Sequence, residues 1–191
     1  ALPILLAICR RKLAEPPPDV QARARLVQGD MTHFDLGQTF GLVTIPFRAF
    51  QHLITVEEQM ACLACVRRHL VPGGRLAFDV FHPHPPRMLD PVFFEEIEEF
   101  SGLMLPDGRT LRRTSRQAAF HRATQSNDIE IIYYITASDG FTERRVQAFP
   151  FRYFFRYEVE HLLARCGFRV AALYGDYERA PFTDDSPEML F

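Results

Sequence analysis

Three residues carry side chains suited to acid–base chemistry and stand close to the ends of predicted elements. Asp79 and His82 lie at the end of an apolar segment predicted as a strand over 75–81, and His52 precedes a predicted helix. A carboxylate or an imidazole in such a place can accept a proton from a bound substrate. We therefore predict catalytic roles for His52, Asp79 and His82. Two simpler interpretations stay open, namely that Asp79 bonds to nearby backbone and that His52 packs on the core.

Two further patterns are compatible with metal or redox chemistry, but neither favours it. Cys62 and Cys65 have the spacing of a metal-binding pair, yet they lie inside a predicted helix and no second pair accompanies them. His82 and His84 flank a proline without an evident third ligand. We therefore predict no metal site.

The composition is that of a globular domain and disfavours several classes of function. The chain has 191 residues, of which 47% are hydrophobic and 24% are charged. A formal net charge of -2 provides no basic field for nucleic acid or an anionic membrane. No apolar run approaches the ~18 residues that span a bilayer. The four cysteines are too few and too scattered for a disulfide framework. We expect a cytoplasmic protein with reduced thiols and no nucleic-acid or membrane partner.

The clearest element is a helix over 55–70. Thr55 and Glu58 have the spacing of a capping box, in which each residue satisfies a backbone N–H of the other. The apolar residues that follow fall on one side of the helix, as expected for a helix with one buried face. Pro72-Gly73-Gly74 is predicted as the turn that ends this unit and positions the next strand.

Helices and strands alternate through the first part of the chain. The predicted elements are a helix that begins at or before residue 1 and ends near 13, strands over 24–28 and 40–45, the helix over 55–70 and the strand over 75–81. Short links between alternating elements indicate crossover connections around a parallel sheet. We therefore predict an α/β fold.

The pattern changes after residue 81. Residues 82–108 are rich in proline and acids and are predicted as a loop with at most one short element, whereas 109–155 alternates with a period close to two. Ser138-Asp139-Gly140 marks a turn there, and we predict an antiparallel insert of three strands. The predicted elements that follow are a helix over 159–166, a strand over 168–174 and a last strand within 187–191. The α/β core then comprises 1–81 and 155–191, and the insert comprises 82–154.

Ligands of an open parallel sheet bind outside the carboxyl ends of its strands. The residues that follow the predicted strands are Gly29-Asp30-Met31, Pro46-Phe47-Arg48, 79–84 and Gly175-Asp176-Tyr177. The segments around them resemble, in order and spacing, the class I S-adenosylmethionine-dependent methyltransferases. The segments that carry the resemblance are Val27–Met31, Phe40–Pro46, Phe50–Leu53, Leu70–Leu76 and Arg165–Phe168. The resemblance covers residues 1–81 and 155–191. Within this family, the chain resembles the small-molecule methyltransferases that carry a β-rich cap, which implies a Rossmann-like sheet.

The resemblance implies a cofactor, S-adenosyl-L-methionine, and residues that bind it. In that family an acid after the third strand bonds the adenine amino group and the next backbone meets the ring, which implies Asp30 and Met31. A carboxylate suits this role because it only accepts hydrogen bonds and the amine donates. The end of the fourth strand would lie beneath the methionine part of the cofactor. The residues implied there are Ile45, Pro46, Phe47, Arg48 and Gln51.

Two family features have no counterpart in this sequence. The glycine-rich first loop and the acid that binds the ribose are absent, because the helix over 2–13 aligns with the helix that follows that acid. The predicted sheet is thus incomplete at its N-terminal side, and its centre would be exposed. We therefore expect residues 1–191 to belong to a longer protein.

The resemblance implies methyl transfer to N or O of a small-molecule acceptor by direct displacement, which requires mainly alignment of the reacting atoms. The insert is expected to cover the pocket, and aromatic residues over 149–155 form either a pocket wall or core. Two alternatives are a non-catalytic binding protein that keeps the fold and a nicotinamide-dependent oxidoreductase; the motifs taken together favour the methyltransferase over the latter. A homodimer is possible.

Overall fold

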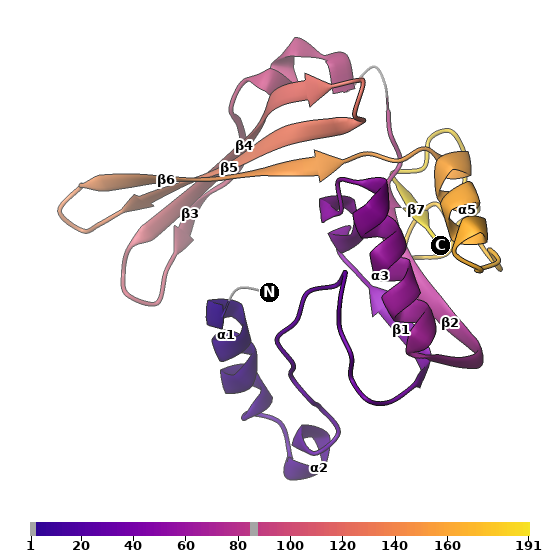
Figure 1. Ribbon diagram of the computed structural model, residues 1–191. Helices are drawn as coiled ribbons and strands as arrows, with labels where there is room; N and C mark the ends of the chain where they lie inside the picture. The colour runs from indigo at the N-terminus through magenta and orange to yellow at the C-terminus, as the bar shows by residue number, and fades with distance from the viewer. Residues whose placement is uncertain (1–2, 85–87) are drawn as a thin grey trace.

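The described residues form two separate β-sheets, one in the α/β core and one in the insert over 82–154, which we call the cap (Figure 1). The computed structural model describes residues 3–84 and 88–191. The core elements are α1 (Pro3–Leu13), α2 (Pro18–Gln21), β1 (Phe40–Ile45), the short helix η1 (Ala49–His52), α3 (Val56–Arg68), β2 (Leu70–Phe81), α5 (Arg156–Arg165) and β7 (Glu188–Leu190). The cap elements are the short helix η2 (Pro91–Phe94) and the strands β3 (Ile97–Met104), β4 (Thr110–His121), β5 (Ser126–Thr136) and β6 (Thr142–Arg152). The predicted α/β fold with an antiparallel insert is confirmed.

The core sheet has the strand order β1-β2-β7. Strands β1 and β2 are parallel, with Ile45 opposite Phe78, and α3 connects them. Strand β7 runs antiparallel to β2 and places Leu190 opposite Asp79. The carboxyl ends of β1 and β2 therefore meet at one edge of the sheet, as the predicted crossover requires.

Helix α3 is specified by local sequence signals. The Thr55 hydroxyl accepts the backbone N–H of Glu58, and the Glu58 carboxylate accepts the backbone N–H of Thr55. Cys62, Leu63 and Val66 form the buried face of the helix. Complete burial of an aliphatic side chain such as Leu63 contributes about 1.5–3 kcal/mol to folding. The predicted helix is confirmed.

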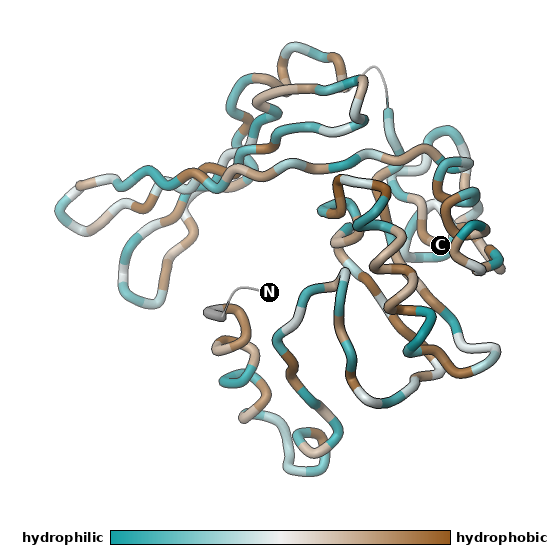
Figure 2. The backbone as a smooth tube through the Cα atoms, in the orientation of Figure 1, coloured by the Kyte–Doolittle hydropathy of each residue, from teal (hydrophilic) through white to brown (hydrophobic). Residues whose placement is uncertain are grey.

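The hydrophobic core joins segments that are far apart in the sequence. The Phe50 ring lies 5.1 Å from the Phe78 ring and 5.7 Å from the Phe154 ring, measured between centroids. Val159 and Leu163 of α5 belong to the same cluster. Figure 2 shows hydrophobic residues spaced along α3 and α5, as expected for helices with one buried face.

Strand β2 is longer than predicted. It begins at Leu70 and contains Pro72-Gly73-Gly74, which was expected to form a turn ahead of a strand that starts at Arg75. The pairing shifts between Phe40–Leu70 and Leu42–Arg75, so β2 uses more residues than β1 to cover this stretch of the ladder. Gly73 supports this irregularity with a φ of 76°, a value that favours glycine. The glycines thus form a bulge inside the strand instead of a turn before it.

The described part of the cap contains four strands instead of the predicted three, in the order β3-β4-β5-β6. The additional strand, β3, lies in the segment predicted as loop. Its acidic residues face arginines of β4, with Glu99 2.9 Å from Arg113 and Glu98 3.7 Å from Arg112. Such cross-strand ion pairs suit an exposed sheet, but they become visible only when the partner strand is known. The predicted turn at 138–140 does connect β5 and β6.

Two predicted strands do not form. Residues 24–28 and 168–174 belong to no ladder in the described structure, and Tyr174 makes only isolated bridges, to Pro181 and Leu190. Both predictions rested on β propensity, which specifies a strand only when a partner strand is available. The predicted first helix corresponds to α1, and the part of it placed at residues 1–2 lies outside the described residues.

Candidate active site

The carboxyl edge of the core sheet carries a pocket of about 400 Å³. Its lining residues are Pro46, Phe47, Arg48 and Tyr177. The first three follow directly after β1, and Tyr177 comes from the segment between α5 and β7. Three residues of the set predicted to bind the cofactor therefore line one pocket.

The loop over 46–48 has a strained backbone. Phe47 and Arg48 have φ values of 59° and 58°, which are unfavourable for side chains with a Cβ atom. The backbone N–H of Arg48 donates to Oδ2 of Asp79 at 3.0 Å. As a result the Phe47 side chain is 85% exposed, a strong exception for a large aromatic residue.

The Arg48 side chain is anchored separately from its backbone. Its guanidinium forms an ion pair with the buried Glu188 of β7, and Nε donates to Oε2 at 3.2 Å. The guanidinium also lies over the Phe81 ring, 3.8 Å from its centroid. The end of β2 therefore holds the Arg48 backbone, and β7 together with Phe81 of β2 holds its guanidinium.

Asp79 holds a second segment at this edge. The Tyr177 hydroxyl donates to Asp79 Oδ2 at 2.8 Å, so one carboxylate oxygen accepts from both the loop and the tyrosine. Burial, followed by this hydrogen bond, raises the pKa of Tyr177 to about 12. Sequence reasoning assigned no role to Tyr177 or Glu188, although Tyr177 belongs to a segment placed after a predicted strand.

Gln51 connects the core to the cap. Its side chain is 1% exposed, its Nε2 donates to the Arg152 carbonyl at 2.6 Å, and its Oε1 accepts the Phe81 N–H at 2.7 Å. Both the NH2 group and the carbonyl oxygen of this amide thus bond inside the protein, and Gln51 does not line the pocket. Contact between Gln51 and the cofactor stays a prediction.

His52 lies where η1 meets the cap. Its ring centroid is 5.2 Å from those of Phe149 and Phe151 of β6. Partial burial lowers the pKa of His52, because a desolvated imidazole resists protonation. The imidazole is therefore neutral at neutral pH and able to accept a proton.

His82 lies just beyond β2 and has a defined tautomer. Its Nδ1 is 2.8 Å from the Ser186 carbonyl oxygen, which can only accept, so Nδ1 carries the proton. In the neutral ring Nε2 keeps its lone pair. The Phe182 ring packs at its side, with 4.7 Å between centroids. This arrangement orients His82 as a proton acceptor.

Asp30 and Met31 lie in the segment between α2 and β1 and do not line this pocket. Oδ1 of Asp30 accepts the Thr32 backbone N–H at 2.8 Å and the Thr32 hydroxyl at 2.7 Å. These bonds lower the pKa of Asp30, so it is ionised. Met31 packs against the main hydrophobic cluster, and the Cys65 thiol of α3 donates to the Thr32 carbonyl at 3.3 Å. The segment is thus fastened to α3.

The cysteines inside α3 are buried thiols. Burial raises the pKa of Cys62 to about 12, so it is protonated at neutral pH. In the stretches 3–84 and 88–191, no group of three or more side chains of the usual metal-ligating types comes together. No helix within these same stretches combines the length and apolar character needed to cross a bilayer.

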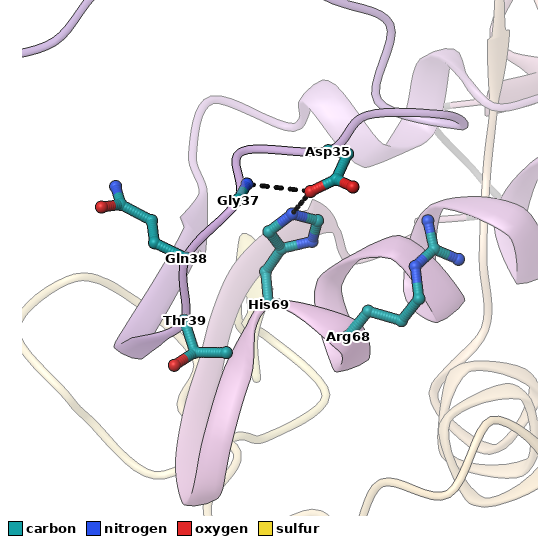
Figure 3. Close-up of a pocket in the computed structure, with 6 residues that line it drawn as sticks. All are labelled: Asp35, Gly37, Gln38, Thr39, Arg68 and His69. Carbon is teal, nitrogen blue, oxygen red and sulfur yellow. Dashed lines mark hydrogen bonds and ion pairs between the residues drawn. The ribbon is translucent and has the colours of Figure 1, made fainter.

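A second open pocket, of about 500 Å³, lies at the opposite edge of the core sheet (Figure 3). It is lined by Asp35, Gly37, Gln38, Thr39, Arg68 and His69. His69 Nε2 accepts the Leu36 N–H at 2.9 Å and Nδ1 is 2.8 Å from the Cys65 carbonyl, a pattern that requires a neutral ring. The 3.5 Å approach of Asp35 to His69 is then a polar contact without ionic character. None of the predicted site residues lines this pocket.

The comparisons with known proteins point to one enzyme class. The sequence is 28% identical over 173 residues to a cypemycin N-terminal methyltransferase from a Streptomyces species, covering 90% of this chain and 63% of that protein. It is 27% identical over 177 residues to a dTDP-3-amino-3,6-dideoxy-alpha-D-glucopyranose N,N-dimethyltransferase from Streptomyces fradiae, covering 90% of this chain and 60% of that protein. The chain thus spans about three fifths of the length of these curated relatives. No family model matches the sequence.

A solved structure agrees with these relatives. The S-adenosylmethionine-bound amino pentose methyltransferase CalS10 from Micromonospora echinaspora superposes with a TM-score of 0.61 at 28% identity. The match covers 85% of this chain and 61% of that chain. In fold and in sequence the chain is thus similar to S-adenosylmethionine-dependent methyltransferases.

Proposed function

We propose that the protein transfers a methyl group to the nitrogen of a small-molecule amine at the edge where β1 and β2 end. The observation that carries the proposal is the strained loop over 46–48, which Asp79 anchors beside the pocket. Strain held in place at the carboxyl edge of an α/β sheet is a feature of ligand-binding regions. The names of the relatives support an amine acceptor, a peptide N-terminus in one case and an amino sugar in two others.

The residues implied for S-adenosylmethionine have a chemistry that fits it. Asp30 uses Oδ1 for the bonds from Thr32, which leaves Oδ2 of an ionised and exposed carboxylate to accept from the adenine amine. Met31 is only partly buried against the hydrophobic cluster and offers apolar surface to the rest of the ligand, whereas Ile45 is buried inside the cluster and would support the site from beneath. When bound, the cofactor supplies an electrophilic methyl carbon on a sulfonium sulfur.

The loop over 46–48 would hold the sulfonium end of the cofactor. The exposed Phe47 ring can present its face to a cationic sulfonium. Arg48 is not free to bind an anion, because its guanidinium is already paired with Glu188. We therefore assign Arg48 a role in shaping the loop and Phe47 a role in contacting the ligand.

Bound S-adenosylmethionine would supply its methyl group to the lone pair of a neutral amine, and the sulfur would keep the electrons of the broken bond as a neutral thioether. The methylated nitrogen is then cationic and must lose a proton. We assign its removal to His82 Nε2, which has a free lone pair, or to the neutral His52. Asp79 already accepts two hydrogen bonds at Oδ2, which favours the imidazoles for this step.

The cap and the cellular location are part of the same proposal. The ring pair Phe149 and Phe151 of β6 contacts His52, so the end of the cap sheet is placed to form one wall above the core edge. We propose that residues 82–154 cover the acceptor and set its specificity. Free thiols at Cys9, Cys62, Cys65 and Cys166 fit a reducing, cytoplasmic setting.

The test is calorimetric titration of the full-length protein with S-adenosylhomocysteine. We expect micromolar binding that Asp30→Ala weakens about tenfold, the effect of losing one charge-assisted hydrogen bond. Asp139→Ala is the matched control, because Asp139 also accepts a turn N–H, from Phe141 at 3.0 Å, but lies at the far end of the cap. Absence of binding by the full-length protein would contradict the proposal and favour a non-catalytic binding role.

A further inference from the structure

Tyr177 occupies a position between the anchored loop and the open pocket. Its hydroxyl bonds to the buried Asp79, yet its side chain is 58% exposed and lines the pocket together with residues 46–48. A tyrosine held in this way presents a fixed polar atom to whatever the pocket binds.

The direction of this hydrogen bond follows from the chemistry of the two groups. An ionised carboxylate can only accept, so the Tyr177 hydroxyl must donate its hydrogen to Asp79 Oδ2 at 2.8 Å. The raised pKa of the phenol, about 12, shows that the hydrogen stays on Tyr177 throughout the neutral range. The hydroxyl oxygen then has only lone pairs for the pocket.

We propose that Tyr177 is a specificity-determining residue that accepts an N–H hydrogen bond from the acceptor amine, and that Asp79 is the positioning residue that fixes the hydroxyl in this polarity. The inference rests on the proposed methyl transfer to nitrogen. An amine whose N–H group is bound by Tyr177 has its lone pair free for the methyl carbon.

The charges around Tyr177 favour the same acceptor. Arg48 and Glu188 form an ion pair, so Asp79 remains as the negative charge beneath the tyrosine hydroxyl. The amine nitrogen becomes positive as the new bond forms, and its N–H bond to Tyr177 strengthens. An interaction that is stronger in the transition state than in the bound substrate accelerates the reaction.

The test compares Tyr177→Phe with Tyr157→Phe in the full-length protein. Tyr157 is the matched control, because it is a similarly exposed tyrosine on α5 and does not line the pocket. The probes are an amino sugar and an unblocked tripeptide, each beside its hydroxyl counterpart, with methyl-labelled S-adenosylmethionine. We expect Tyr177→Phe to lower kcat/KM for the reactive amine about tenfold and to leave S-adenosylhomocysteine affinity unchanged.

Asp79→Asn tests the charge beneath the tyrosine. The amide oxygen can take the place of Oδ2 and accept both the Arg48 N–H and the Tyr177 hydroxyl, so the variant keeps both hydrogen bonds and removes the negative charge. We expect a loss of amine methylation smaller than that of Tyr177→Phe. In protein labelled with carbon-13 at tyrosine Cζ, the Tyr177 signal should titrate at lower pH in this variant than in the wild type.

Each result supports or overturns the inference. Wild-type kinetics in Tyr177→Phe, or a wild-type Tyr177 that titrates like the exposed Tyr157, would overturn it. Binding of S-adenosylhomocysteine with methylation of the hydroxyl probes only would overturn the amine assignment while the methyl-transfer function stands. No binding of S-adenosylhomocysteine would overturn both.

Discussion

The Asp79 carboxylate takes the place of a strand partner for the Arg48 backbone. Strand β1 pairs with β2 as far as Ile45 opposite Phe78, and the next residue of β2 is Asp79. At that level the Arg48 N–H bonds to the Asp79 side chain instead of to a backbone carbonyl. A side chain of the neighbouring strand thus continues the contact while the chain turns away in a left-handed conformation. This hydrogen bond from Arg48 to the Asp79 side chain holds the loop that lines the pocket.

Replacement of Phe47 should separate stability from ligand binding. Phe47→Gly relieves the unfavourable positive φ and removes a ring that is 85% exposed, so we expect the free energy of unfolding to stay level or rise by about 1 kcal/mol. S-adenosylhomocysteine binding should weaken, because the ring is assigned to the ligand. Urea unfolding and calorimetry measure the two effects. Phe141→Gly is the control, since Phe141 is 69% exposed without a positive φ: it should lower the free energy of unfolding by about 0.5–1 kcal/mol and leave binding unchanged.

The ion pair between Arg48 and Glu188 should behave as a coupled unit. Arg48→Met leaves the Glu188 carboxylate, 6% exposed, without its cation, and breaking a buried pair in this way costs about 3 kcal/mol of stability. The double variant Arg48→Met/Glu188→Gln leaves no buried unpaired charge and should recover a large part of that loss. Urea unfolding of both single variants and the double variant completes the cycle. Strict additivity would contradict the coupling.

Stability should fall in mild acid because of His52. Burial lowers its pKa in the folded state below the ordinary value of 6.5, so the unfolded chain binds a proton first as the pH falls. The contribution of His52 to stability is therefore complete above pH 6.5 and is lost progressively as the pH falls toward the folded pKa. His52→Gln should flatten this part of the profile of unfolding free energy against pH. An unchanged profile would show that the ring is fully solvated.

The same shift predicts the pH dependence of the activity if His52 accepts the proton. Activity should then decline only below pH 6.5, as the imidazole becomes protonated, and this inflection should disappear in His52→Gln. An inflection that persists in His52→Gln and disappears in His82→Gln would instead assign the proton to His82. Initial rates measured against pH distinguish the two residues.

Thiol labelling should report the state of α3. Cys62 is fully buried with a pKa raised to about 12, whereas Cys9 is exposed. Because the thiolate is the reactive form, iodoacetamide should modify Cys9 rapidly and Cys62 only after unfolding. Peptide mass spectrometry after timed labelling measures both rates. Equal rates under native conditions would mean that α3 opens readily.

The sequence by itself determined the elements whose signals are local. The Thr55–Glu58 capping box, the apolar face of α3 and the turn at 138–140 each involve residues a few positions apart, so a single segment contains the information. The order of strand ends likewise predicted that Pro46-Phe47-Arg48 would follow a strand at the carboxyl edge of the sheet, where these residues line a pocket. Strand β3 was missed because its acidic residues are explained only by the arginines of β4.

Tertiary structure alone decided how the site is held together. Arg48 meets Asp79 across 31 positions of sequence, Tyr177 meets Asp79 across 98, and Arg48 meets Glu188 across 140. Gln51 reaches the Arg152 carbonyl across 101 positions, which explains why its buried linking role was not predicted. Hydrogen bonds and ion pairs depend on the distance in space between two groups. Sequence spacing reports that distance within a helix or a turn, but not between elements that packing brings together.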